Sequence, residues 1–321
     1  MTAIRLGVIG AGIMGERMLR AALDHAADTV QIVGVWDPSA AARARIAAGL
    51  PGVSLAASAE ALIAAADCVY IASPPASHLP LSAAVLAAGK AVFCEKPLAS
   101  DVAAAAAFVE SARGKRAAVN FPMATYFAAE RLRGWLAEGA IGTPQRLEIE
   151  VAFANWPRGW QQDAASWLDG PAEGGFTREV VSHFLFLTGR LVGPMTLGAH
   201  SASFPQAGRG ERAITATLTA GGLPVQLTGA VGSTEKDDHN LWTLTGDCGA
   251  VRIRDWAAAE RLVDGVWQPD TEAMPQDTAR PLVLKRQLAG VAAMVRGEAH
   301  PLATLEEAFA VQRVVEGILA A

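Results

Sequence analysis

The sequence predicts an α/β domain built on a parallel sheet, followed by an α+β domain with a large, open, mostly antiparallel sheet. In the N-terminal third, short apolar runs alternate with alanine-rich segments of helical length. Beyond it, segments that alternate apolar and polar residues dominate. A chain of 321 residues also favours two domains over one. We therefore assign residues 1–122 to the first domain and 123–321 to the second.

Five apolar runs in the first domain are expected to be strands. Because helical segments separate them, consecutive strands should form βαβ units and hence a parallel sheet. The runs are apolar throughout, which is typical of strands covered by helices on both faces. The expected strands are residues 4–9, 31–36, 68–72, 91–94 and 117–120, and the expected helices are 12–25, 40–48, 77–88 and 102–113.

The second domain is expected to have a sheet with one packed face, because residues 214–218 read Ile-Thr-Ala-Thr-Leu. The other face is expected to pair subunits into a homodimer or homotetramer. The last helix should begin with a capping box formed by Thr304 and Glu307. The expected strands are 145–153, 197–203, 213–218, 225–232, 241–245 and 250–253, and the helices are 126–138, 175–187, 282–296 and 305–319.

Composition excludes several classes of function. The net charge is -5 and the basic residues are scattered, so neither a nucleic acid nor an anionic membrane is expected as a partner. The three cysteines form no CxxC pair and no cluster with metal-ligand spacing, which predicts a reducing compartment and no metal site. No apolar run approaches the ~18–20 residues of a membrane helix. We expect a cytoplasmic protein with a small-molecule substrate.

A glycine motif, GxGxxG, follows the first expected strand and opens a helix. Gly10 permits a tight turn, Gly12 lets the backbone approach a diphosphate, and Gly15 allows close packing of helix on strand. The N–H groups at the start of the helix, around Ile13 and Met14, then face the phosphates. In this context the motif predicts a dinucleotide-binding Rossmann domain.

An acidic residue, Asp37, follows the second expected strand. At this distance from the glycines, a carboxylate accepts hydrogen bonds from the ribose hydroxyls of the dinucleotide. It would repel a 2′-phosphate, and no arginine follows it immediately. The sequence therefore favours NAD, with NADP as the alternative cofactor.

Two further motifs carry a family resemblance. Residues 71–78 read Ile-Ala-Ser-Pro-Pro-Ala-Ser-His, and residues 95–97 read Glu-Lys-Pro after the fourth expected strand. Together with the glycine motif they resemble the Gfo/Idh/MocA oxidoreductases, which include glucose–fructose oxidoreductase and inositol dehydrogenase. The resemblance places Lys96 beside the nicotinamide and the substrate oxygen, where a cation stabilises developing negative charge. It also implies a cis bond before Pro97, and these contacts to the cofactor: Ser73, Pro74, His78, Glu95 and Lys96.

A second catalytic element is implied by the same resemblance. The family has an Asp and a His four residues apart on a helix after a glycine-rich turn, and here Glu179 and His183 match them. On an α-helix that spacing puts both on one face. His183 would exchange a proton with the substrate, while Glu179 would orient it or bind the substrate. Val181 and Phe186 replace the Gly and the later Asp common in the family, which implies a more apolar pocket wall.

The remaining candidates lie near these motifs. Trp156 and Trp160 stack on a substrate in one interpretation, with Arg158 holding a carboxylate or phosphate; in the other they pack in the core or at an interface. Arg178, beside the catalytic candidates, either binds an anion or faces solvent.

The predicted function is an NAD(P)-dependent dehydrogenase or reductase that transfers hydride between nicotinamide and a small polar substrate. Sugars, polyols and related carbonyl or imine compounds are the expected substrates. One alternative is an NAD-dependent glycoside hydrolase. The other is a regulator that senses dinucleotide without turnover, which ranks last because Lys96 and His183 are both present.

Overall fold

The computed structural model describes residues 2–237 and 239–320, which divide into two compact units. The first unit contains the chain up to Pro122 together with Arg280–Phe309. The second contains Met123–Ala279 and the segment from Ala310 onward. The sequence analysis assigns residues 123–321 to one continuous domain, whereas residues 280–309 return to the first unit. The physical reason is apolar packing, because Leu284, Leu288 and Val291 belong to the core of the first unit.

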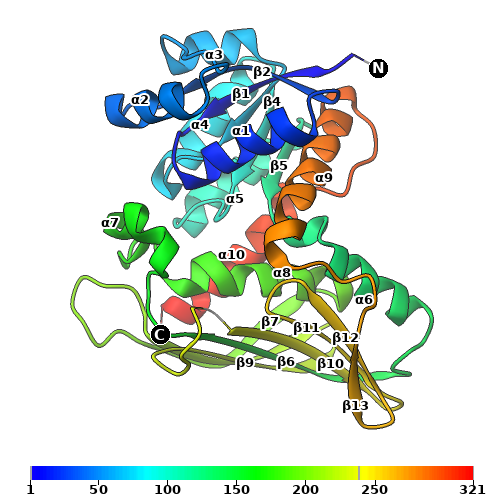
Figure 1. The fold of residues 1–321 in the computed structure, drawn as a ribbon. Helices are drawn as coiled ribbons and strands as arrows, with labels where there is room; N and C mark the ends of the chain where they lie inside the picture. The colour runs from blue at the N-terminus through cyan, green and yellow to red at the C-terminus, as the bar shows by residue number, and fades with distance from the viewer. Residues whose placement is uncertain (1, 238, 321) are drawn as a thin grey trace. The chain divides into compact units, whose positions relative to one another are not determined.

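The first unit is built on a five-stranded parallel sheet (Figure 1). Its strand order, β2-β1-β3-β4-β5, is that of a doubly wound sheet, so the predicted fold class is confirmed. The strands are β1 (Ile4–Ile9), β2 (Val30–Trp36), β3 (Cys68–Ile71), β4 (Ala91–Glu95) and β5 (Ala117–Asn120).

Helices cover both faces of this sheet, as its continuously apolar strands predict. On one face, Leu6, Tyr70 and Phe93 share a core with residues of α1, α2 and α9. On the other, α3 packs against β1 and β2, and α4 against β3 and β4. The short helix α3 was not predicted. The 3₁₀ turn η1 (Pro75–Ser77) directly precedes α4. The helices are α1 (Ile13–His25), α2 (Ala40–Gly49), α3 (Ala59–Ala65), α4 (His78–Ala87), α5 (Val102–Ser111) and α9 (Gln276–Arg296).

The second unit contains an eight-stranded sheet of order β13-β12-β11-β10-β6-β9-β8-β7. All neighbours are antiparallel except β6 and β9. The predicted alternation is present in β8, where Ile214, Ala216 and Leu218 are buried between exposed threonines. Strands β12 and β13 were not predicted. The strands are β6 (Pro144–Phe153), β7 (Met195–Ser203), β8 (Ala213–Ala220), β9 (Leu223–Val231), β10 (His239–Gly246), β11 (Ala250–Arg254), β12 (Ala258–Val263) and β13 (Val266–Pro269).

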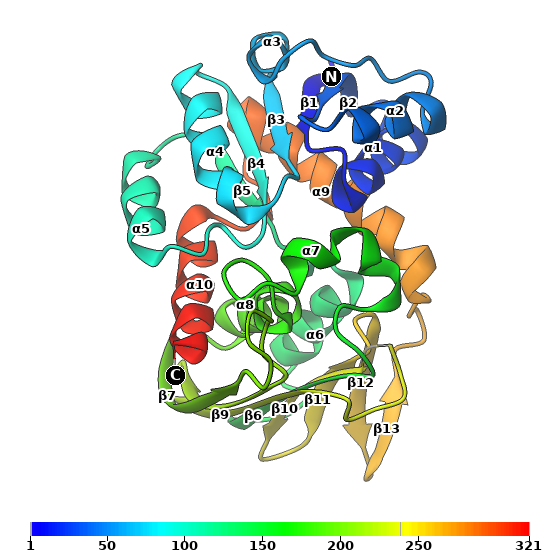
Figure 2. The same ribbon diagram turned by 90° about the vertical axis from the view of Figure 1, so that its left-hand side faces the viewer.

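Helices lie on one face of this sheet (Figures 1 and 2). The exposed threonines of β8 alternate with its buried residues and so lie on the other face. The helices are α6 (Phe127–Ala137), α8 (Ser182–Leu191) and the later part of α10 (Leu305–Leu319). The predicted capping box of α10 is present: Thr304 N–H donates to Glu307 Oε2 at 2.8 Å, and Glu307 N–H to Thr304 Oγ1 at 3.2 Å. Within the described residues, no helix combines the length and apolarity needed to cross a bilayer.

Candidate active site

The glycine turn after β1 has the geometry that a dinucleotide requires. Gly10 adopts φ 102, and a Cβ on Gly15 would lie 1.9 Å from the Gly10 carbonyl oxygen, so both positions need glycine. Gly12 caps α1 without a side-chain hydrogen bond, and a Cβ there would meet no described atom within 4 Å. The backbone at Gly12, at the start of α1, therefore adjoins open space, which fits a diphosphate.

Asp37 lies directly beside this turn. Its Oδ2 accepts a hydrogen bond from Ala11 N–H at 2.8 Å, and its Oδ1 accepts one from Ser39 N–H at 2.8 Å. Two cations are close: Arg43 donates to the Asp37 carbonyl and Arg45 to the Ala11 carbonyl. No arginine follows Asp37 immediately in the sequence, but α2 brings these two back from further along the chain.

His78 connects the two loops that carry the family motifs. It is buried at the start of α4, with Nδ1 2.7 Å from the Pro97 carbonyl oxygen and Nε2 2.8 Å from that of Ser73. The Lys96–Pro97 bond is cis, as the resemblance implied. Both ring nitrogens of His78 therefore face protein carbonyls, and its evident role is to join the loop after β3 to the loop after β4.

Three side chains converge where β3, β4 and β5 end. Glu95 Oε1 accepts hydrogen bonds from the Tyr70 hydroxyl and from Asn120 Nδ2, the latter at 2.7 Å. Burial raises the pKa of Tyr70 well above its usual value, and the Glu95 carboxylate adds to the effect, so this phenol stays a donor. Glu95 Oε2 lies 3.3 Å from Lys96 N, whose N–H donates to it. The backbone of Lys96 is thus fixed by a buried network.

The helix with the second catalytic element begins with a π-helical segment, η4 (Thr177–Val181), and continues as α8. The sequence predicts one helix over residues 175–187, whereas the structure has a π-helical segment before α8. Glu211 Oε1 accepts hydrogen bonds from Thr177 N and Oγ1, both at 2.6 Å. Gly175, at φ 97, leaves room for this carboxylate, since a Cβ would lie 2.1 Å from Glu211 Oε2. Such π-helical turns often occur at functional sites.

His183 and Glu179 both lie on this segment. Because Glu179 is in the π-helical part, α-helical spacing does not describe the geometry of this pair. His183 is 7% exposed, and its ring packs edge to face on Trp256, with centroids 5.3 Å apart and planes at 78°. No sequence motif indicates a role for Trp256. Val181 and Phe186 are both buried.

Arg178 is held inside the second unit. Its Nε and Nη2 donate to the two carboxylate oxygens of Glu316 at 2.8 and 2.7 Å. Its Nη1 donates to the carbonyls of Pro171 and Gly174 at 2.9 and 2.8 Å. These four hydrogen bonds give the buried guanidinium a structural role in joining α10 to the glycine-rich turn.

The two tryptophans of the loop after β6 differ. Trp156 is buried, with its ring edge-on to Phe153 at 5.2 Å and Phe176 at 6.1 Å, so it packs in the core. Trp160 is 40% exposed. The buried Arg158 lies over both rings, at 5.7 Å and 4.8 Å from their centroids. Trp160 is therefore the more exposed ring of this loop, and Arg158 packs against it.

The predicted site residues thus fall into two sets. The cofactor residues and Lys96 belong to the first unit, whereas Glu179 and His183 belong to the second. In the part of the chain that the structure describes, no group of three or more His, Cys, Asp or Glu side chains could hold a metal ion.

Comparisons with known proteins agree with this geometry. Residues 4–121 match the Gfo/Idh/MocA family model, described as an oxidoreductase family with an NAD-binding Rossmann fold. No curated protein matches the sequence.

Solved structures share the fold over nearly the whole chain. An Agrobacterium radiobacter oxidoreductase in complex with NAD+, L-tartaric acid and magnesium is 17% identical, with a TM-score of 0.83, covering 99% of this chain and 97% of that one. The Bordetella pertussis WlbA dehydrogenase, in complex with NADH and UDP-GlcNAcA, is 20% identical, with a TM-score of 0.79 and the same coverage. Biliverdin reductase from Synechocystis, in complex with biliverdin and NADP+, is 22% identical, with a TM-score of 0.75 and 98% coverage of both chains. Residues 4–121 therefore match the model of the Gfo/Idh/MocA oxidoreductase family, which has an NAD-binding Rossmann fold, as the motifs predicted.

Proposed function

We propose that this chain is a dehydrogenase or reductase that uses NAD to interconvert an alcohol and a carbonyl, or an amine and an imine, on a small polar molecule. Sugars and polyols are the first substrates to test. The observation that carries the proposal is the pairing, in one unit, of an open glycine turn at Gly12 with Lys96 held at the end of β4. The first binds a dinucleotide and the second supplies a cation.

The cofactor residues have separate tasks. The N–H groups at the start of α1 bind the diphosphate, and the Asp37 carboxylate binds the adenosine ribose. When bound, the nicotinamide accepts or donates the hydride. Arg43 and Arg45 provide positive charge near Asp37, so NADP is the cofactor to compare. Asp37 favours NAD, because its carboxylate repels a 2′-phosphate.

Lys96 acts on the substrate oxygen. Its ammonium group holds the hydroxyl or carbonyl and stabilises the negative charge that develops on oxygen as the C–H bond forms or breaks. The Glu95 carboxylate, fixed by Tyr70 and Asn120, accepts a hydrogen bond from the Lys96 backbone N–H. The start of the Lys96 side chain is thereby fixed.

His183 moves the proton. A neutral imidazole accepts the hydroxyl proton when the substrate is oxidised, and an imidazolium returns it in the reverse direction. Its position on α8 follows from the Glu211 cap at Thr177 and from the ring of Trp256. Glu179 is the candidate for a second polar contact to the substrate.

The test is a substrate screen followed by two variants. Sugars, polyols, imino acids and keto acids are incubated with NAD or NADH while NADH absorbance is followed. For a substrate that turns over, Lys96→Ala and His183→Asn should each lower kcat about 100-fold or more, and NADH affinity measured by calorimetry should stay nearly unchanged in His183→Asn.

Lys90→Ala is the matched control. Lys90 directly precedes β4, whereas Lys96 directly follows it, and Lys90 Nζ donates to the Ala66 carbonyl at 2.7 Å. In this variant kcat should therefore stay near that of the wild type. Full activity in Lys96→Ala would overturn the proposal. Glycoside cleavage without net NADH would show that the chain is a hydrolase instead.

A further inference from the structure

The connection between β11 and β12 contains two consecutive non-glycine residues in the left-handed region. Asp255 has φ 46 and Trp256 has φ 71. Aspartate tolerates this conformation better than most residues, but a bulky side chain such as tryptophan rarely adopts it. Backbone strain of this kind persists only where the surroundings impose it, and it is concentrated at functional sites. The contacts of Asp255 and Trp256 account for their left-handed conformation.

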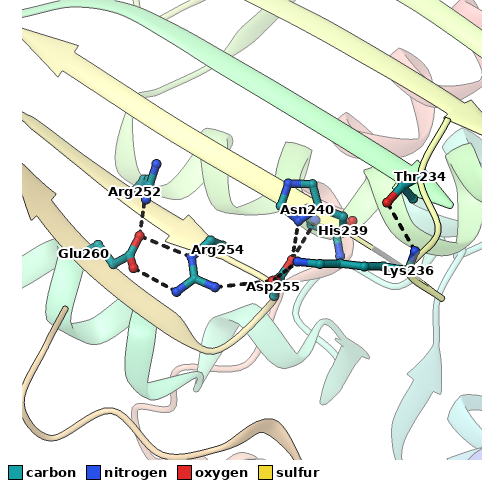
Figure 3. Close-up of polar contacts among 8 residues, drawn as sticks. All are labelled: Thr234, Lys236, His239, Asn240, Arg252, Arg254, Asp255 and Glu260. Atoms are coloured by element: carbon teal, nitrogen blue, oxygen red, sulfur yellow. Dashed lines mark hydrogen bonds and ion pairs between the residues drawn. The ribbon is translucent and has the colours of Figure 1, made fainter. Parts of the chain in front are cut away.

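Asp255 is anchored by its backbone and its carboxylate (Figure 3). Its N–H donates to the Asn240 carbonyl at 2.9 Å, and its Oδ1 accepts from Asn240 N–H at 3.2 Å and from His239 Nδ1 at 2.8 Å. Its Oδ2 lies 3.5 Å from Lys236 Nζ and 3.5 Å from Arg254 Nη1. The first residue of the turn is thus tied to β10 and surrounded by three basic side chains.

A second acid braces the same turn from β12. Glu260 is buried, and its Oε1 accepts from Arg254 Nη2 at 2.9 Å while its Oε2 accepts from Arg252 Nε. Figure 3 shows that Arg254 lies between the two acids, Glu260 and Asp255. Ion pairs therefore connect β11, β12 and the turn, and hydrogen bonds connect the turn to β10.

The turn presents the ring of Trp256 to α8. Besides its edge-to-face contact with His183, this ring lies 5.3 Å from the ring of Phe184, with planes at 36°. Edge-to-face packing has a preferred geometry, so it restricts the plane of the imidazole. All these residues belong to the second unit.

We infer that Trp256 is a positioning residue for His183, and that the Asp255 network holds the strained turn which presents it. The inference rests on the proposed function for the proton-transfer role of His183. Proton transfer needs donor and acceptor within hydrogen-bonding reach and aligned. A misplacement of about 1 Å can cost about 100-fold in rate. The Trp256 ring, which the Asp255 network holds against the His183 imidazole, supplies that alignment.

The first test measures the contact itself. In the chain without cofactor or substrate, the NMR signal of the His183 imidazole, assigned with His183→Asn, should show a ring-current shift. The shift should be lost in Trp256→Leu and largely kept in Trp256→Phe. Both replacements retain a β-carbon and hence the strain of the turn. Trp267→Leu is the control, since Trp267 is also partly buried but lies over Arg252, 4.0 Å from its guanidinium carbon.

The second test is kinetic. With a substrate from the screen, Trp256→Leu should lower kcat about 10- to 100-fold, while KM changes less than about 3-fold. Trp256→Phe should restore most of kcat, and Trp267→Leu should match the wild type. Normal kcat in Trp256→Leu beside an inactive His183→Asn would overturn the positioning role alone. Full activity in His183→Asn would instead overturn the proposed function.

A third variant separates the anchor from the ring. Asp255→Gly accepts the left-handed conformation without strain but removes the carboxylate. We expect kcat to fall about 3- to 10-fold and the His183 shift to decrease, because the turn is no longer held. Wild-type values for both would show that the ion-pair network does not hold Trp256.

Discussion

The two units hold their candidate catalytic groups in different ways. In the first, Tyr70, Glu95 and Asn120 meet because parallel strands in register end together; Glu95 pairs directly with Asn120 in the sheet. In the second, Trp256 reaches His183 from a strained turn braced by ion pairs. The difference follows from the sheets. A sheet covered on both faces lets strand register bring buried polar groups together, whereas a hairpin end on a sheet with one packed face needs added bracing.

The largest effect is expected at the glycine turn of the first unit. Gly15→Ala puts a methyl group 1.9 Å from the Gly10 carbonyl and should cost about 3 kcal/mol or more of unfolding free energy, measured in urea. Gly12→Ala meets no described atom within 4 Å, so it should change stability by less than about 1 kcal/mol. It should still weaken NADH binding measured by calorimetry. A Gly15→Ala chain as stable as the wild type would contradict the steric argument.

The bracing of the second unit is tested by Glu260→Gln. This change removes the carboxylate that Arg252 and Arg254 share, so that Arg254 keeps only Asp255, and it should cost about 1–3 kcal/mol at pH 7. Burial tends to raise the pKa of Glu260, but Arg254 and Arg252 outweigh it and lower the pKa overall. The stabilisation of the folded chain by the Glu260 carboxylate is therefore complete above the ordinary glutamate pKa of about 4.3. It is lost as the pH falls through the lower pKa that Glu260 has in the folded chain.

Unfolding in urea from pH 7 to pH 3 should thus show the wild type and Glu260→Gln converging. Glu148→Gln is the control, because Glu148 and its partner Arg146 are both 56% exposed. We expect less than about 0.5 kcal/mol for that surface pair. A pH-independent difference for Glu260→Gln would show that lost packing, rather than charge, causes its effect.

The hydrogen-bonded network of the first unit should give a smaller effect. Tyr70→Phe removes a donor to the buried Glu95 carboxylate and should cost about 1–2 kcal/mol in urea unfolding. The other tyrosine of the chain, Tyr126, donates to the neutral amide oxygen of Gln276 at 2.6 Å. Tyr126→Phe should cost about 0.5–1 kcal/mol. Equal costs would mean that the charge on Glu95 adds nothing to the network.

The smallest expected effect is slow labelling of a single cysteine by a thiol reagent. Cys68 and Cys94 are buried in strands of the first unit, whereas Cys248 is exposed in the turn after β10. The Asp247 side chain raises the pKa of Cys248 by hydrogen bonding and by its charge, so that thiol should react slowly. A thiol reagent should label one cysteine in the native chain and three in urea. Labelling of a second native thiol would show that a strand of the first unit opens.

Much of the fold was predictable from the sequence, and the exceptions have physical causes. The five parallel strands are uninterrupted apolar runs, so their positions were predicted to within about one residue. Strand β12 was missed because a charged residue, Glu260, occupies a buried position and breaks the expected alternation. The start of α9 was placed after Pro281, yet the helix extends back through it to Gln276.

The arrangement of the candidate site residues was predictable only where it is local in sequence. The glycine turn, Asp37 and Lys96 lie in short motifs whose backbone geometry follows from neighbouring residues. The contact of Trp256 with His183, the Glu211 cap and the Arg178–Glu316 pair join distant segments, and no periodicity indicates them. The π-helical turn was missed for a similar reason, because its sequence resembles that of an ordinary helix.

The return of residues 280–309 to the first unit affects how the protein is made. During synthesis, the sheet face that awaits Leu284, Leu288 and Val291 has no cover until these residues have left the ribosome. A fragment ending at Pro122 would expose the same apolar face permanently and would be prone to aggregate. A shortened nucleotide-binding fragment should therefore carry α9 on a linker.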